Sequence, residues 1–170
     1  MSAVGPVRKT KTGRDDWETP WPLFRALDRE FRFTLDAAAD EQNRKCFCWL
    51  AGPHVEGNGC TCGLCADWLD HVAFVNPPYG RGLQTWIEKC ADAAERGATV
   101  GALLPANTDT RWFRWVVETC NELRLLYGRV NFDGSTSGNT GGSMVAIWRP
   151  ERPRQGGPRW CLWDWRKVAT

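Results

Sequence analysis

Four consecutive residues combine side chains and a backbone that could hold an amino group for chemistry: Asn76, Pro77, Pro78 and Tyr79. They follow the apolar run at residues 72–75, which predicts a short buried strand. A strand that ends in a polar residue, two prolines and an aromatic forms a rigid segment at the carboxyl edge of a sheet. Open α/β folds bind ligands at this edge, so the tetrapeptide predicts a binding site.

The residue types in the tetrapeptide favour chemistry on an aromatic amine. Such an amine is a poor nucleophile because its lone pair is delocalised into the ring. The side-chain carbonyl of Asn76 and the backbone carbonyl of Pro77 can both accept from one NH2 group, and Pro78 has no N–H to compete for them. Two acceptors favour the pyramidal nitrogen that attacks a methyl donor, mainly in the transition state. We therefore predict amino-group methylation, against the alternative of a proline-rich turn.

Tyr79 completes the predicted site with a flat ring. A base that has been removed from its stack could lie against this ring. The structural alternative is a tyrosine that is simply buried after the turn.

The elements predicted around this site alternate between strands and helices. Thr19 and Pro20 fit a helix start, because threonine can cap a helix and proline suits its first position. Strands are expected at residues 32–36, 72–75, 100–104, 123–126, 129–132 and 144–148, and helices after Pro20, at 83–94 and after a cap at 107–109. This alternation predicts an α/β fold with a doubly wound, mostly parallel sheet.

Several segments, taken in order, resemble the phage-type DNA N6-adenine methyltransferases. They are WETP at 17–20, FTLDAAA at 33–39, DW at 67–68, FVNPPYG at 74–80, LPA at 104–106, TDT at 108–110, WF at 112–113 and GRV at 128–130 before Phe132. The resemblance extends to about Pro150. It implies a small S-adenosylmethionine-dependent methyltransferase-like fold, S-adenosyl-L-methionine as methyl donor, and the exocyclic N6 amine of adenine in DNA as acceptor.

The strand expected at residues 32–36 ends in a carboxylate, Asp36. The resemblance implies that Asp36 and the adjacent Ala37 meet the polar end of the cofactor. The alternative is that Asp36 caps the segment at residues 37–39. That segment contains no glycine, unlike the glycine-rich first βα turn of most such folds, so the resemblance suggests a variant of this turn.

Further cofactor contacts are expected on either side of this strand. Trp17 with Thr19 and Pro20 is expected to close over the donor from the N-terminal side, as in related amino-methyltransferases. Asp67 could add a polar contact, and Trp68 a stacking face for the cofactor's adenine. A surface acid and a core tryptophan remain the alternative for that pair.

Five cysteines lie in one short segment that also contains His54: Cys46, Cys48, Cys60, Cys62 and Cys65. In a cytosolic chain this density favours a metal site or free thiols over disulfides. Cys60, Cys62 and Cys65, with Cys48 or His54, could form a tetrahedral structural zinc site. The spacing is not that of paired CxxC motifs, and transfer to an amine requires no metal.

The composition predicts one globular domain with basic ends. The chain has 170 residues, of which 42% are hydrophobic and 25% charged. We predict a basic arm at residues 1–16, a methyltransferase domain at 17–150 with a Cys-rich insertion at about 46–65, and a basic Trp-rich tail at 151–170. Residues 1–14 carry +4 and residues 149–170 carry +4, so the middle carries −6.

The distribution of charge and the loops suggest how DNA would be held. Basic ends would grip phosphate, with an affinity that falls steeply with salt; two solvated tails are the alternative. The loop at 133–142, rich in Gly, Ser, Thr and Asn, is expected near bound DNA. Trp160, Trp163 and Trp165 are expected to dock the tail on the domain, and Trp86, Trp112 and Trp115 to belong to the core.

No apolar run approaches the ~18 residues that a membrane-spanning helix needs, and residues 1–14 lack the apolar centre of a signal peptide. We therefore expect a cytoplasmic protein without a membrane partner. Other functions remain open from sequence: methylation of cytosine N4, of an RNA base or of a protein glutamine, and a non-catalytic nucleic-acid-binding module with a zinc knot.

Overall fold

The computed structural model describes residues 18–51, 62–132, 141–151 and 155–168. Its helices are α1 (Trp21–Phe31), α2 (Leu83–Glu95), α3 (Arg111–Thr119) and the short 3-10 helix η1 (Trp165–Lys167). Its strands are β1 (Leu35–Asp36), β2 (Cys48–Trp49), β3 (Val72–Val75), β4 (Thr99–Pro105), β5 (Glu122–Leu126), β6 (Ser143–Trp148) and β7 (Arg159–Trp163).

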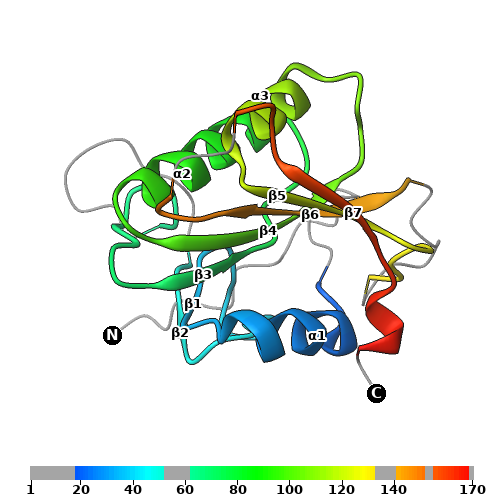
Figure 1. The fold of residues 1–170 in the computed structure, drawn as a ribbon. Coiled ribbons are helices and arrows are strands. Elements are labelled where there is room, and N and C mark those ends of the chain that lie inside the picture. Colours follow the sequence, from blue (N-terminus) through cyan, green and yellow to red (C-terminus); the bar gives the residue numbers. More distant parts are fainter. Residues whose placement is uncertain (1–17, 52–61, 133–140, 152–154, 169–170) are drawn as a thin grey trace, which may run out of the picture.

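The strands form one sheet in the order β2-β1-β3-β4-β6-β5-β7. Among these described strands, β6 alone runs antiparallel to its neighbours β4 and β5, and the remaining pairs are parallel. Helices α2 and α3 cover one face of the sheet, and α1 and η1 cover the other (Figure 1). The predicted fold class, a mostly parallel sheet with helices on both faces, is confirmed.

The order of the strands reverses at β1. The chain passes from β1 to β2 on one side, and then to β3 and β4 on the other. Leu35 pairs with Ala73 and Asp36 with Phe74, and the Ala37 N–H donates to the carbonyl of Phe74 at 2.9 Å. The segments after β1 and β3 therefore leave the sheet side by side. In open α/β sheets, ligands bind at such a reversal, outside the carboxyl ends of the strands.

The core has two parts, one on each face of the sheet. Ala73 and Val75 of β3 point toward α2, whereas Phe74 packs with α1. In β6, Met144, Ala146 and Trp148 belong to the first part and Val145 and Ile147 to the second. Because successive side chains in a strand point to opposite faces, these apolar runs are buried on both sides, as parallel sheets require.

Some predicted elements differ from those in the structure. Residues 129–132 do not form a strand: β5 ends at Leu126 and Gly128 follows with a φ of +74°, although Val130 and Phe132 still reach the core. Of the strand expected at residues 32–36, only Leu35 and Asp36 are paired as a strand.

Two helix starts also differ from those predicted. Pro20 is the N-cap residue of α1, and no side chain caps this helix, so Thr19 does not act as its cap. Thr110 caps α3 by accepting the N–H of Phe113 at 3.3 Å, in place of the residues expected at 107–109. Threonine is a favourable residue at this position.

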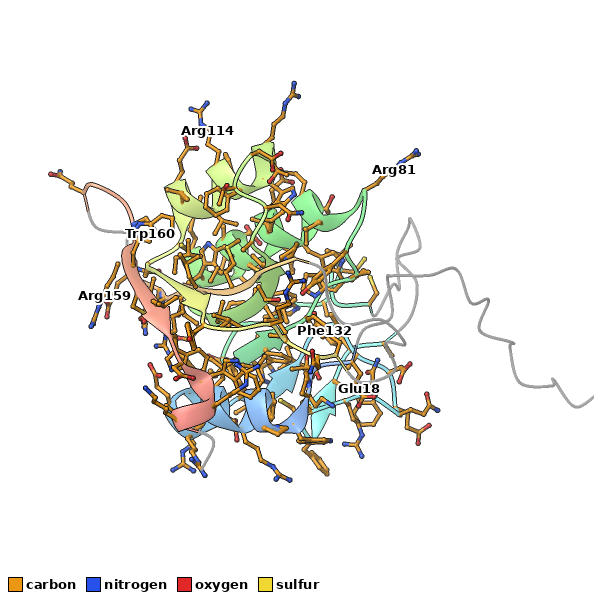
Figure 2. The ribbon with its side chains drawn as sticks, turned by 90° about the vertical axis from the view of Figure 1, so that its right-hand side faces the viewer. Glu18, Arg81, Arg114, Phe132, Arg159 and Trp160 are labelled. Atoms are coloured by element: carbon orange, nitrogen blue, oxygen red, sulfur yellow. The ribbon has the colours of Figure 1, made fainter. Side chains whose placement is uncertain are left out.

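The C-terminal segment docks on the domain, as predicted. Strand β7 pairs in parallel with β5, and Trp165 is 7% exposed within the core beside α1. Trp160 remains 48% exposed at the edge of the sheet, where Figure 2 shows it next to Arg159. The prediction that Trp115 belongs to the core is wrong, because α3 turns this side chain toward solvent and leaves it 41% exposed.

A buried arginine joins helix α1 to strands β5 and β7. Arg124 of β5 is 6% exposed and donates two hydrogen bonds of 2.7 Å to the carboxylate of Glu30 and one of 2.7 Å to Glu122. Its guanidinium also lies 5.3 Å from the ring centres of both Phe31 and Trp163. This cluster ties the end of α1 to β5 and β7.

Among the described residues, no helix combines the length and the apolar character that crossing a membrane would require.

Candidate functional site

The tetrapeptide directly follows β3 at the point where the strand order reverses. Val75 is fully buried, Asn76 is half-buried, Pro77 is buried and Pro78 is exposed. The backbone thus emerges from the core at Asn76 and reaches solvent at Pro78. The structure therefore places the segment at the carboxyl edge of the sheet, as predicted.

The ring of Tyr79 is supported from the neighbouring loop. It meets the ring of Phe132 edge-to-face, with centroids 6.3 Å apart and an interplanar angle of 87°. Figure 2 shows Phe132 at this edge of the fold. Burial raises the pKa of the Tyr79 hydroxyl well above its usual value, so the side chain is neutral at physiological pH. The residue offers a ring held in place by an aromatic neighbour.

Asp36 lies at the end of β1, beside the start of this segment, and is 3% exposed. Its carboxylate accepts the backbone N–H of Lys45 at 2.9 Å and also that of Ala38. Burial raises the pKa of Asp36 to about 6, while these hydrogen bonds and the Lys45 ammonium act to lower it. Asp36 thus caps the segment after β1. This is one of the two roles that the sequence allowed for it, and the other is contact with the cofactor.

The raised pKa of Asp36 predicts a pH dependence of stability. The pKa of about 6 lies above the ordinary value of 3.8, so the folded state binds the proton more tightly than the unfolded state. The contribution of this group to stability is then present below pH 4 and is lost as the pH rises through about 6. Urea denaturation of the parent and of Asp36→Asn at pH 5 and pH 7.5 measures this. The parent should lose stability relative to the variant between the two pH values. If the difference in unfolding free energy between parent and variant is the same at both pH values, the raised pKa of Asp36 is contradicted.

Lys45 anchors the N-terminal segment beside β1. Its ammonium is 2.8 Å from the carboxylate of Glu18 and 4.5 Å from the ring centre of Trp21, and its side chain is 2% exposed. Thr19 and Pro20, which follow Glu18 in the sequence, are both buried. Sequence patterns did not indicate Lys45, because its partners are distant in the chain.

Thr19 carries a buried polar atom. The side chain is 2% exposed, and its hydroxyl has no hydrogen-bond partner among the described residues. Trp17, predicted beside it, lies outside the described residues.

A cavity of about 200 Å³ opens between the segments that follow β1 and β3. Its wall includes Ala38, Ala39, Asp40, Asn43, Pro78 and Trp86. The wall combines apolar side chains with a carboxylate and an amide, a combination typical of small-molecule sites. The predicted residue Ala37 is fully buried one position before this wall, and its N–H belongs to the sheet. Asp40, Asn43 and Trp86 were not predicted, because only the folded loops bring them together.

Gly63 allows a close contact that shapes this cavity. A Cβ at this position would lie 1.9 Å from the carbonyl oxygen of Ala37 and 2.6 Å from the ring of Trp86. We expect Gly63→Ala to push the segment after β1 away from Trp86 and to cost about 1–3 kcal/mol of stability, as overpacking does. Thermal unfolding checks this against Gly82→Ala, whose added Cβ would meet nothing within 4 Å. Equal melting temperatures of the two variants would contradict the contact.

Neither Asp67 nor Trp68 lines this cavity, although Trp68 lies directly behind it, against Gly63 and Trp86. Asp67 pairs with Arg96 at 2.6 Å, near the start of β4 and therefore at the opposite edge of the sheet. A backbone hydrogen bond from Leu69 and the guanidinium of Arg96 lower the pKa of Asp67. Trp68 is fully buried in the core. These contacts match the alternative of a surface acid and a core tryptophan.

The cysteines of the predicted metal site are only partly described. Cys48 lies exposed in β2, Cys62 is buried and Cys65 is exposed. Cys60 and His54 fall outside the described residues. Within the part of the chain that the structure describes, no group of three or more His, Cys, Asp or Glu side chains is placed to hold a metal ion. Burial raises the pKa of the nearby Cys46 thiol to about 12.

Taken together, the geometry supplies a rigid polar segment, a supported aromatic ring and a cavity at one sheet reversal. Asn76 and Tyr79 lie in the same segment as Pro78, which lines a cavity that a second ligand could occupy. This arrangement suits transfer of a small group between two bound molecules.

Comparisons with known proteins agree with this site. The family model for DNA N-6-adenine-methyltransferase (Dam) matches residues 7–157. The chain is 28% identical over 151 residues to a DNA N-6-adenine-methyltransferase of Haemophilus phage HP1, covering 84% of this chain and 83% of that protein. It is 32% identical over 103 residues to the protein of the same name from Escherichia phage T1, covering 59% of this chain and 40% of that protein. Because the family model spans most of its length, the chain belongs to the DNA N-6-adenine-methyltransferase (Dam) family.

Proposed function

We propose that this protein is an adenine-specific DNA methyltransferase that transfers the methyl group of S-adenosyl-L-methionine to the N6 amine of adenine. The observation that carries the proposal is the position of the Asn76–Tyr79 segment, directly after β3 and beside a cavity at the sheet reversal. Membership of the family supports the same reaction.

Asn76 and Pro77 hold the target amine. The Asn76 side-chain carbonyl and the Pro77 backbone carbonyl accept its two hydrogens, which turns the nitrogen lone pair away from the ring. Pro77 is buried and Pro78 has a fixed φ, so the Pro77 carbonyl keeps its position without reorganisation. These contacts strengthen as the nitrogen becomes pyramidal and positive, and therefore act on the transition state.

Tyr79 positions the base. Its neutral ring, supported by Phe132, stacks on an adenine that has left the duplex. Stacking and the two acceptors together define the plane of the base and the direction of its amine. Alignment of this kind accounts for much of the rate of a transfer between two bound molecules.

The residues around the small cavity fit one end of the methyl donor. S-adenosyl-L-methionine, when bound, supplies a methyl group on a positively charged sulfur together with its own leaving group. Asp40 and Asn43 lie at the cavity wall and supply a carboxylate and an amide. A cavity of about 200 Å³ is below the ~300 Å³ at which whole-ligand pockets begin, so it takes only part of the donor.

DNA is the macromolecular partner in this proposal. Arg81 and Arg111 are exposed at the starts of α2 and α3, next to the site, and neither forms an ion pair within the described residues. Figure 2 shows Arg81 pointing away from the fold. Both are suited to phosphate contacts, which make binding strongly salt-dependent. With phage relatives, the proposed reaction belongs in the cytoplasm of a host bacterium.

Analysis of methylated nucleosides tests the proposed function. The purified protein is incubated with methyl-labelled S-adenosyl-L-methionine and unmethylated DNA, which is then digested to nucleosides and separated by mass. We expect the label in N6-methyldeoxyadenosine, and none in a duplex that contains only G and C. Label in N4-methyldeoxycytidine, in RNA or in protein would contradict the proposal, as would a protein that binds the donor and methylates nothing.

A further inference from the structure

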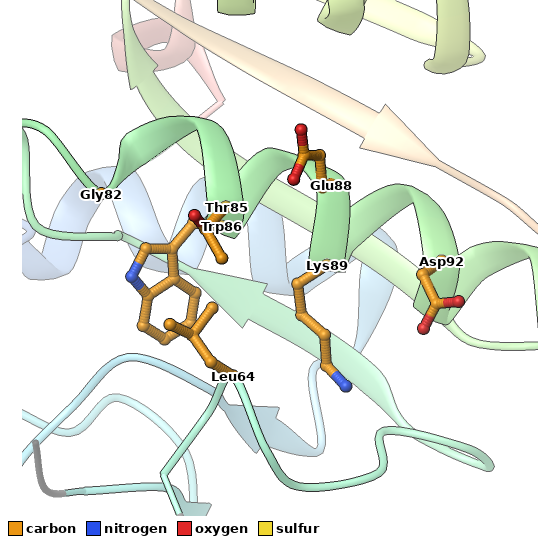
Figure 3. A pocket seen from close by; sticks show the side chains of 7 residues that line it. All are labelled: Leu64, Gly82, Thr85, Trp86, Glu88, Lys89 and Asp92. Carbon is orange, nitrogen blue, oxygen red and sulfur yellow. The ribbon is translucent and has the colours of Figure 1, made fainter. Parts of the chain in front are cut away.

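Trp86 forms part of the wall of two cavities. The smaller cavity, next to Pro78, has Trp86 in its wall. A larger one of about 560 Å³ extends along the outer side of α2 and is lined by Leu64, Thr85, Trp86, Glu88, Lys89 and Asp92. Figure 3 shows the indole of Trp86 beside Leu64, with Lys89 farther along the helix. Gly63 and Leu64, which are adjacent in sequence, line the smaller and the larger cavity respectively.

The indole of Trp86 is held firmly. It stacks on Trp68 with centroids 6.5 Å apart and an interplanar angle of 29°. Trp68 is fully buried, and its indole N–H donates to the carbonyl of Gly63 at 3.0 Å. Trp86 is only half-buried, so part of its surface faces the cavities. A half-exposed aromatic ring with a buried aromatic support is a suitable platform for another ring.

The position of Pro78 indicates where each end of the donor lies. The transferred methyl must lie close to the target amine, and Pro78 joins the amine-binding segment to the smaller cavity. This adjacency favours the smaller cavity for the sulfonium end of the donor. Because Trp86 lines both cavities, the nucleoside end can continue past it into the larger cavity, whose volume suits a nucleoside.

We infer that Trp86 is the stacking residue for the adenine of S-adenosyl-L-methionine, and that the larger cavity along α2 holds the nucleoside part of the donor. This inference rests on the proposed function. Glu88 and Asp92 supply carboxylates that can accept the ribose hydroxyls. Trp86 is thus a positioning residue that places the donor's methyl next to Asn76.

Calorimetry with S-adenosylhomocysteine, the demethylated product, tests the role of the Trp86 ring without relying on activity. Loss of one base–aromatic stacking contact weakens binding by about tenfold or more. We therefore expect Trp86→Leu to raise Kd by about that factor, and Trp86→Phe to stay within about threefold of the parent because it keeps a ring. Thermal unfolding verifies that both variants are folded. A folded Trp86→Leu with parental affinity overturns the inference.

A variant that fills the larger cavity tests the inference even if Trp86→Leu does not fold. Thr85 is exposed on the larger cavity, so Thr85→Trp fills the space without disturbing the core. Glu95→Trp adds the same side chain at an exposed position of α2 that does not line the cavity. We expect Thr85→Trp to weaken S-adenosylhomocysteine binding about tenfold or more, and Glu95→Trp to leave it unchanged.

The outcomes distinguish failure of the proposed function from failure of the Trp86 assignment alone. If the parent protein does not bind S-adenosylhomocysteine, the proposed function fails and this inference fails with it. If the parent binds, and Thr85→Trp or a folded Trp86→Leu binds equally well, the inference alone is wrong. If both variants weaken binding while Trp86→Phe and Glu95→Trp do not, the assignment of the nucleoside cavity is supported.

Discussion

Replacing Asn76 by alanine is expected to lower the rate of methyl transfer to DNA by about 100-fold to 1000-fold, the usual effect of removing one hydrogen-bonding group that acts on a transition state. The variant removes a side-chain acceptor at the end of β3 but leaves the Pro77 carbonyl in place. Because Asn76 is half-buried beyond the strand, the fold should tolerate the change. Single-turnover kinetics with labelled donor measures the effect.

Two controls separate catalysis from binding. Affinity for S-adenosylhomocysteine should stay within about threefold of the parent in Asn76→Ala, since the proposed contact is to the base and not to the donor. Asn76→Asp keeps side-chain acceptor oxygens, so it should retain more activity than the alanine variant. Transfer by Asn76→Ala within about tenfold of the parent rate would contradict the proposed role.

Replacing Arg124 by alanine is expected to produce the largest loss of stability, about 3–5 kcal/mol. Burial acts to lower the pKa of Arg124, but hydrogen bonds and charges from Glu30 and Glu122 more than offset this and hold the pKa above its usual range. Removal of the guanidinium leaves Arg149, at 3.2 Å, as the ion-pair partner of Glu122 among the described residues, and removes the contacts with Phe31 and Trp163. Urea denaturation measures the change.

Arg114 supplies the matched control for this prediction. It forms an exposed ion pair of 2.7 Å with Glu118 one helical turn away. Exposed pairs of this kind contribute little to stability because solvent screens them, so Arg114→Ala should be nearly neutral. If Arg124→Ala loses less than about 1 kcal/mol, or no more than Arg114→Ala, the buried cluster does not hold α1 against the sheet as described.

The elements that carry the site could be predicted because their signals are local. The apolar run of β3 has the bounds expected from sequence, and the polar and proline residues after it mark where the strand must end. Helical spacing also gave α2, and Gly97, with a φ of +118°, follows its end as expected. Resemblance to one family then connected these local patterns to a reaction.

The parts that could not be predicted depend on contacts between distant residues. The sequence predicts Trp86 as a core residue and Trp68 as a stacking face for the cofactor's adenine, but in the folded chain Trp68 is the buried partner and Trp86 the half-exposed one. Lys45 pairs with Glu18 across 27 positions, which no short pattern indicates. Residues 129–132 alternate like a strand but find no partner strand in the sheet.

The most direct test of the central claim is the position of the target amine in a crystal structure of the protein with S-adenosylhomocysteine and an adenine-containing DNA. The account predicts that the adenine N6 lies within about 3.5 Å of both the Asn76 Oδ1 and the Pro77 carbonyl oxygen, with the base stacked on Tyr79. An adenine N6 farther than about 4 Å from both oxygens, with the donor product bound, would contradict it.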